Sequence, residues 1–127
     1  MTSLMTATAL SYVAVIDDDP ALCRSFNRLL RAAGFQAVSY DSAEMFLADA
    51  RRPQFACLVL DIQMGGISGL ELHRQLTSLG SAIPVIYLTA VEDPAVHDAA
   101  LALGCAGYFR KTDPGQTVLD AIRQTVG

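Results

Sequence analysis

The 127-residue sequence has no long run of basic residues: its nine Lys and Arg cluster no further than the pairs Arg51-Arg52 and Arg110-Lys111. With 13 acidic residues, the formal net charge is −4. Domains that bind the nucleic-acid backbone carry a basic patch or stripe. We therefore expect no direct nucleic-acid binding by this chain.

Long apolar segments and paired cysteines are also missing. No apolar stretch approaches the roughly 20 residues that span a bilayer, and residues 1–10 lack the basic start of a signal peptide. Cys23, Cys57 and Cys105 are an odd number at wide spacing without a CxxC pair, as expected of reduced thiols. We expect a cytoplasmic protein without a membrane segment, with a tail at 1–10 and one domain at 11–127.

Short apolar runs alternate with helical patterns along the rest of the chain. The five strand-like runs are YVAVID, FQAVSY, FACLVLD, IPVIYLTA and GYFRK. Between the first two, apolar residues from Leu22 to Ala33 recur at helical spacing, and Gly34 follows where a helix-ending glycine belongs. Near-continuous apolar strands alternating with helices indicate a parallel sheet covered on both faces. We expect an α/β fold: a doubly wound five-stranded parallel sheet of flavodoxin-like order 2-1-3-4-5, with five helices.

Several helix starts are marked by an acidic residue. The pairs Asp19-Pro20, Asp93-Pro94 and Asp113-Pro114 each place a carboxylate cap before a proline suited to the first helical position. A fourth start is expected at a capping box formed by Asp41 and Glu44.

Polar side chains stand at the ends of four of the expected strands. Asp17 and Asp18 follow the first strand, Asp61 the third, Thr89 the fourth and Lys111 the fifth. In open parallel sheets, ligands bind beyond the carboxyl ends of the strands, where the strand order reverses. With the order 2-1-3-4-5 these four strands are neighbours, so we expect the five side chains to converge on one edge of the sheet.

Crowded carboxylates repel each other unless a cation lies among them, and an all-oxygen ligand set favours a hard ion such as Mg²⁺. An Asp in this place can also attack a phosphoryl group, while the metal and a Lys neutralise the phosphoryl oxygens and a Thr hydroxyl donates a hydrogen bond. His73 and His97 are expected at the surface of helices, and no metal-ligand spacing pairs them. The sequence thus predicts a magnesium site with phosphoryl-transfer chemistry.

Four sequence blocks, in order and at these strand ends, resemble the receiver domain of two-component response regulators, and the similarity is greatest to receivers attached to LuxR-type DNA-binding domains. The blocks are VIDDDP, LVLDIQMGGISGLEL, IYLTA and GYFRK. The resemblance covers the chain from about Tyr12 to Val126. It implies a signalling protein, not an enzyme, that catalyses only its own phosphorylation and dephosphorylation. A sensor histidine kinase would supply the phosphoryl group, and phosphorylation could drive homodimer formation.

The resemblance also implies which residues form the phosphorylation and metal site. Asp61 would be the phosphoacceptor. Asp18 and Asp61 would ligate Mg²⁺ directly, Asp17 would act largely through water, and the main-chain carbonyl of Gln63 would supply a further ligand.

The switch residues are implied in the same way. Thr89 would be the switch hydroxyl, Lys111 the phosphate partner, and Tyr108 the aromatic residue whose position follows that of Thr89. The surface of the fourth helix, fifth strand and fifth helix would then change and carry the partner or homodimer contact.

Two departures from the family pattern affect loops. Gly65 follows Met64 where the family usually has proline, and Thr112 follows Lys111 where proline is frequent. Glycine frees the loop after Asp61, and a Lys-Thr junction lacks the conformational bias that a following proline imposes. Neither change removes a group that the chemistry needs.

Two other kinds of function remain as alternatives. A receiver-like interaction module that works without phosphorylation would not need the complete set of acidic, Thr and Lys residues. A haloacid-dehalogenase-type phosphatase needs a second Asp where this chain has Gln63, and a flavodoxin needs a Ser/Thr-rich phosphate loop where this chain has Asp17, Asp18 and Asp19. No GxxxxGK nucleotide loop occurs.

Overall fold

The structure is a computed structural model that describes residues 11–127, so the expected tail at 1–10 lies outside the described residues. Strand and helix alternate throughout the described part. The strands are β1 (Tyr12–Ile16), β2 (Gln36–Tyr40), β3 (Phe55–Leu60), β4 (Val85–Thr89) and β5 (Gly107–Arg110). The helices are α2 (Pro20–Ala32), α3 (Ala43–Ala48), α4 (Gly69–Ser78), α5 (Pro94–Ala102) and α6 (Gly115–Val126). Among them, none has the length and apolar content that a membrane crossing requires.

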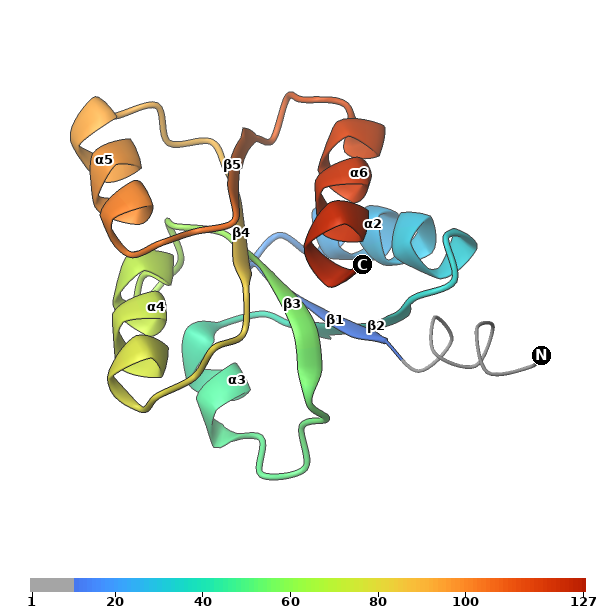
Figure 1. The fold of residues 1–127 in the computed structure, drawn as a ribbon, viewed down its shortest axis with the longest axis horizontal. Coiled ribbons are helices and arrows are strands. Elements are labelled where there is room, and N and C mark those ends of the chain that lie inside the picture. Colours follow the sequence, from blue (N-terminus) through green and yellow to red (C-terminus); the bar gives the residue numbers. More distant parts are fainter. Residues whose placement is uncertain (1–10) are drawn as a thin grey trace.

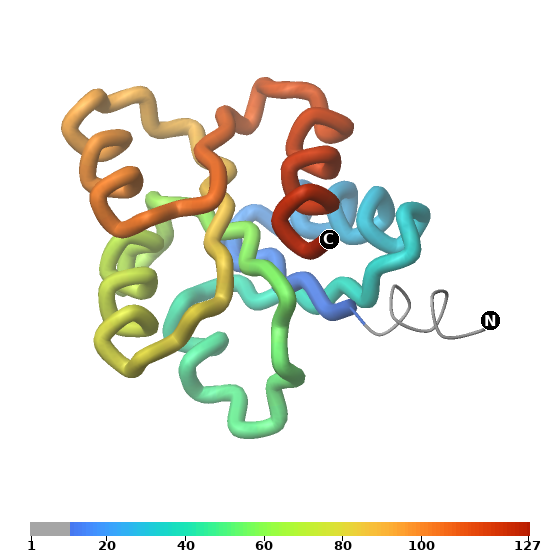
Figure 2. The backbone as a smooth tube through the Cα atoms, in the orientation of Figure 1, coloured from blue at the N-terminus to red at the C-terminus, as the bar shows by residue number. Residues whose placement is uncertain are grey.

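The five strands form one parallel sheet in the order β2-β1-β3-β4-β5, which confirms the predicted fold. Helices α2 and α6 cover one face of the sheet, and α3, α4 and α5 cover the other (Figure 1). The backbone trace shows the final helix returning to the side of the first (Figure 2). Because the strands are parallel, all of their carboxyl ends lie at the same edge of the sheet.

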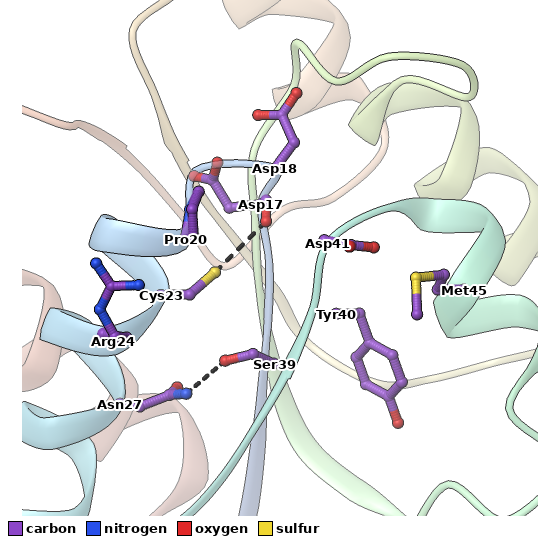
Figure 3. Close-up of a pocket in the computed structure, with 10 residues that line it drawn as sticks. All are labelled: Asp17, Asp18, Pro20, Cys23, Arg24, Asn27, Ser39, Tyr40, Asp41 and Met45. Atoms are coloured by element: carbon purple, nitrogen blue, oxygen red, sulfur yellow. Dashed lines mark hydrogen bonds between the residues drawn. The ribbon is translucent and has the colours of Figure 1, made fainter.

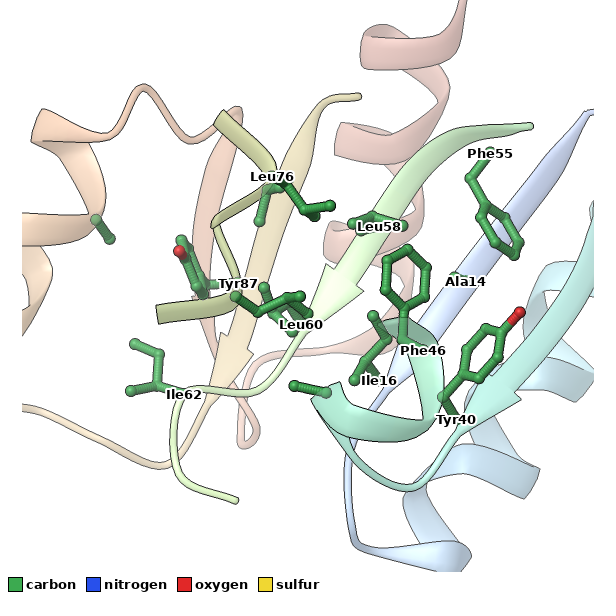
Figure 4. Close-up of a cluster of buried hydrophobic side chains, with 14 residues drawn as sticks. Ala14, Ile16, Tyr40, Phe46, Phe55, Leu58, Leu60, Ile62, Leu76 and Tyr87 are labelled. Carbon is green, nitrogen blue, oxygen red and sulfur yellow. The ribbon is translucent and has the colours of Figure 1, made fainter. Parts of the chain in front are cut away.

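The side chains of the central strands alternate between two hydrophobic cores. Ala14 and Ile16 of β1 face the core under α3, α4 and α5 (Figure 4), whereas Val13 and Val15 face the core under α2 and α6. Because both faces are covered, successive residues are apolar and the strands read as continuous hydrophobic runs.

Two of the predicted carboxylate caps are confirmed. Asp19 Oδ1 accepts hydrogen bonds from the backbone N–H groups of Ala21 and Leu22 at the start of α2, at 3.0 and 3.3 Å. Asp93 Oδ1 accepts one from the N–H of Ala95 at the start of α5, at 2.9 Å.

The capping box predicted at Asp41 and Glu44 is wrong. The N-cap of α3 is Ser42, whose Oγ accepts a hydrogen bond from the Met45 N–H at 3.0 Å. A hydroxyl one residue closer to the helix takes the cap position. Glu44, which a capping box would turn back toward the helix start, instead binds the backbone of Ile67 in a distant loop.

The cap predicted at Asp113 is also wrong. Its Oδ2 accepts a hydrogen bond from the Arg110 N–H at 2.9 Å, and α6 begins after Pro114 without a side-chain cap. Short acidic side chains readily bind nearby backbone groups in turns. Here that local bond holds the turn after β5 and leaves the carboxylate unavailable to the helix.

His73 is buried, which corrects the surface position predicted for it. Its ring lies on the side of α4 that faces the sheet, and its Nδ1 is 2.8 Å from the Tyr87 hydroxyl on β4. This hydrogen bond satisfies the polar nitrogen inside the core, and burial lowers the pKa of the imidazole. His97 on α5 is exposed, as predicted.

Candidate functional site

Four charged residues meet at the carboxyl edge of the sheet. Asp17 and Asp18 follow β1, Asp61 follows β3 and Lys111 follows β5. One carboxylate oxygen from each aspartate lies within 4.8 Å of the other two. Asp17 and Asp61 are buried, whereas Asp18 is exposed beside an open cavity of about 480 Å³ (Figure 3). The structure thus brings together these four predicted site residues.

Lys111 bridges the two buried carboxylates. Its Nζ lies 2.9 Å from Asp17 Oδ2 and 3.1 Å from Asp61 Oδ2. Burial alone would lower the pKa of Lys111, but the hydrogen bonds to the two carboxylates and their negative charges together outweigh it and raise that pKa. Burial raises the pKa of Asp17, and the bonds from the Asp19 N–H and from Lys111 only partly offset this effect. Lys111 therefore stays charged, and the buried carboxylates depend on positive charge nearby.

Backbone groups hold the two buried carboxylates in place. Asp61 Oδ1 accepts a hydrogen bond from the Ile62 N–H at 2.8 Å, and Asp17 Oδ1 accepts one from the Asp19 N–H at 2.9 Å. On the other side, the Cys23 thiol of α2 donates to the Asp17 carbonyl at 3.4 Å (Figure 3). Each carboxylate thus has one oxygen bound to the backbone and the other bound to Lys111.

The loop after Asp61 closes tightly where α4 begins. The Gly69 N–H donates to the Ile62 carbonyl at 2.9 Å, and a Cβ at position 69 would lie only 2.0 Å from the Asp61 carbonyl oxygen. Only glycine fits there, a requirement that sequence reasoning missed. Gln63, predicted to offer its carbonyl to a metal, lies exposed in this loop.

The two predicted switch residues bind the same peptide segment. Thr89 is fully buried, and its Oγ1 accepts a hydrogen bond from the Val91 N–H at 3.2 Å. The Tyr108 hydroxyl donates to the Val91 carbonyl at 3.1 Å, and its ring centroid lies 4.5 Å from that of His97 on α5. Thr89 is joined to the carboxylate cluster through the backbone, because the Lys111 N–H donates to the Thr89 carbonyl at 3.0 Å.

Fold and site together define a receiver-type signalling domain, and sequence comparison agrees. Residues 13–123 match the family described as response regulator receiver domain. The chain is 34% identical to the response regulator protein TodT of Pseudomonas putida over 113 residues, which are 89% of this chain and 50% of TodT. It is 37% identical to the transcriptional regulatory protein FixJ of Azorhizobium caulinodans over 116 residues, covering 91% of this chain and 54% of FixJ.

A solved structure supports the same assignment. The response regulator receiver protein from Burkholderia phymatum is 36% identical with a TM-score of 0.79, and the match covers 92% of this chain and 95% of that one. The chain belongs to the response regulator receiver family, the signalling domains of two-component systems. It spans about half the length of TodT and FixJ.

Proposed function

We propose that this chain is a phosphorylation-dependent switch in the cytoplasm, in which Asp61 accepts a phosphoryl group from the phosphohistidine of a sensor histidine kinase. The observation that supports this most directly is the cluster at the sheet edge, where Lys111 lies between the buried carboxylates of Asp61 and Asp17. This arrangement puts a nucleophile and a positive charge within one hydrogen bond of each other. Phosphoryl transfer depends chiefly on such positioning and charge neutralisation.

In the proposed step, a carboxylate oxygen of Asp61 attacks the phosphorus atom and the P–N bond to the kinase imidazole breaks. The bonding electrons pass to the imidazole nitrogen, and an acyl phosphate forms on Asp61. Lys111, already 3.1 Å from Asp61 Oδ2, is placed to pair with a phosphoryl oxygen. Water later attacks the phosphorus, which releases inorganic phosphate and restores the carboxylate. The chain thus acts on its own residue and not on a separate substrate.

The acidic residues fit a hard divalent cation. Three carboxylates offer oxygen atoms within 4.8 Å of each other, and the exposed Asp18 leaves the cluster open to solvent. Oxygen-only ligand sets suit Mg²⁺. We assign direct ligation to Asp18 and Asp61, a water-mediated role to Asp17, and a further ligand to the Gln63 carbonyl. When bound, Mg²⁺ would neutralise the carboxylates and the incoming phosphoryl oxygens.

The switch would act through Val91. If Thr89 turns to donate a hydrogen bond to a phosphoryl group on Asp61, its Oγ1 moves relative to the Val91 N–H from which it now accepts. Tyr108 is bound to the carbonyl of the same residue, so a shift of this segment alters its position and its ring contact with His97. We propose that the resulting change on α5, β5 and α6 forms the contact with a partner or a second copy of the chain.

Phosphorylation is tested by intact mass after incubation with acetyl phosphate and Mg²⁺. The wild-type chain should gain the mass of one phosphoryl group, and Asp61→Asn should gain none. Asp120→Asn is a matched control, because Asp120 is an exposed carboxylate on α6 that does not line the cavity beside Asp18, and it should not affect labelling. A chelator should prevent the mass gain. Labelling that persists in Asp61→Asn would remove Asp61 from its role, and an unlabelled wild-type chain would favour the interaction module.

A further inference from the structure

Glu44 makes a hydrogen bond far from its own helix. It lies in the first turn of α3, and its Oε2 accepts a hydrogen bond from the Ile67 backbone N–H at 2.9 Å. Ile67 belongs to the loop that connects Asp61 to α4. A carboxylate bound to a backbone N–H makes a charge-assisted bond, which is stronger than a bond between neutral groups. Helix α3 is therefore tied to the loop that follows the proposed phosphoacceptor.

The loop is shaped to receive this carboxylate. Gly66 has a φ of +90°, and a Cβ at that position would lie 2.3 Å from Glu44 Oε2. A side chain at position 66 would thus strain the backbone and also displace the carboxylate. Gly65 differs, since a Cβ there would meet nothing within 4 Å and its φ is not in the positive range. The second glycine of the pair is the one that the contact with Glu44 requires.

The hydrogen bond between Glu44 and Ile67 restrains a loop that is already closed at its base, next to the start of α4. At the base, the Gly69 N–H binds the Ile62 carbonyl. Gln63 lies between these two ties, so the direction of its carbonyl depends on both. Gly65 adds no restraint from within the loop, because glycine leaves the backbone conformationally free. In this sequence, the bond from Glu44 supplies a restraint from outside the loop.

We propose that Glu44 is a positioning residue that holds the loop of residues 62–68 in the conformation that binds Mg²⁺. The proposal rests on the function proposed for Asp61 and deepens it. Glu44 itself does not contact the metal or the phosphoryl group in this account. It acts through Ile67, by limiting the conformations open to the Gln63 carbonyl. Mutation of residues that orient metal ligands commonly lowers metal affinity or activity.

The test uses four variants and three measurements: Mg²⁺ affinity, labelling rate and amide hydrogen exchange. Glu44→Ala should weaken Mg²⁺ binding by about three- to tenfold in calorimetric titration, because it removes one restraint on the loop. Glu44→Gln keeps an oxygen that can accept from Ile67 and should stay within about twofold of wild type. Gly66→Ala should weaken Mg²⁺ binding at least as much as Glu44→Ala, because it displaces the carboxylate and also strains the backbone, and Gly65→Ala should behave like wild type. The maximal labelling rate at saturating Mg²⁺ should be unchanged in Glu44→Ala.

The third measurement needs neither metal nor phosphate. Amide hydrogen exchange of the metal-free protein should be faster at Ile67 in Glu44→Ala and close to wild type in Glu44→Gln, with α2 and β1 unaffected in both. If the wild-type chain binds no Mg²⁺ and accepts no phosphoryl group, the proposed function fails. If the wild-type chain does both, and Glu44→Ala keeps its Mg²⁺ affinity or its protection at Ile67, the role of Glu44 is overturned.

Discussion

Helices α2 and α5 begin with the same signal but are held very differently. Each starts at an Asp-Pro pair whose carboxylate caps the first turn. Helix α2 buries Cys23, Phe26 and Leu30 against the sheet. Of the nine residues of α5, only Ala100 is buried, and Leu101 is 53% exposed. A shared start signal therefore says where a helix begins and nothing about how firmly it packs.

This difference in burial agrees with where the two helices lie relative to the site. Helix α2 lies beside the acidic residues of the site, where the Cys23 thiol donates a hydrogen bond to the Asp17 carbonyl. Helix α5 lies beside Tyr108, on the surface proposed to change with phosphorylation. A buried Leu or Phe stabilises a fold by about 1.5–3 kcal/mol, and an Ala buries much less area. The weakly anchored helix is the one that can shift at little cost.

The largest expected effect comes from the same substitution made in each helix. Leu30→Ala in α2 should lower the free energy of unfolding by about 2–5 kcal/mol, because Leu30 is completely buried. Leu101→Ala in α5 should change it by less than about 0.5 kcal/mol, since that side chain is half in solvent. Urea denaturation of both variants measures the difference. Similar losses in the two variants would show that α5 is anchored as firmly as α2.

A smaller effect should come from the polar contact beneath α4. Tyr87→Phe leaves the buried His73 Nδ1 without its hydrogen-bond partner, which should lower the free energy of unfolding by about 1–3 kcal/mol. Tyr108→Phe is the comparison on the α5 side, where the hydroxyl bond to Val91 is only partly buried. We expect a loss of about 1 kcal/mol or less there, because water can replace the hydroxyl. Equal losses in urea denaturation would contradict the distinction between a fixed α4 and a loosely held α5.

The smallest of the expected effects should accompany activation of the chain by a phosphoryl group on Asp61. Addition of the phosphoryl mimic beryllofluoride with Mg²⁺ should alter amide hydrogen exchange in α5 and β5, because Thr89 and Tyr108 share Val91 as a partner. Exchange in α2 should stay the same. Analytical ultracentrifugation under the same conditions tests for a second copy on this surface. Changes confined to residues 61–67 would mean that the signal does not reach α5.

The fold could be predicted almost completely because its signals are local. Apolar runs that alternate with helical spacing require two covered faces, and this leaves few arrangements of a parallel sheet. The caps at Asp19 and Asp93 were also predictable. The two wrong helix starts share a cause, since Ser42 and the Arg110 N–H offered alternatives one to three residues away. A local signal fails where a second local partner competes with it.

The grouping of the site residues followed from topology, since each follows the end of a neighbouring strand. What the sequence did not reveal were contacts between residues distant along the chain. Glu44 lies 23 residues before its partner Ile67, and His73 lies 14 residues before Tyr87. No periodicity connects such pairs. The nearest sequence signal is the Gly65-Gly66 pair, because the missing Cβ at Gly66 leaves space for the carboxylate.

The most direct test of the account is to locate the phosphorylated residue chemically. Borohydride reduces an aspartyl phosphate to homoserine while leaving free carboxylates intact, and peptide mass spectrometry then identifies the altered position. After incubation with acetyl phosphate and Mg²⁺, we expect homoserine at Asp61 and unchanged aspartate at Asp17 and Asp18. Homoserine at Asp17 or Asp18, or at no position in a chain that has gained phosphate, would contradict Asp61 as the acceptor.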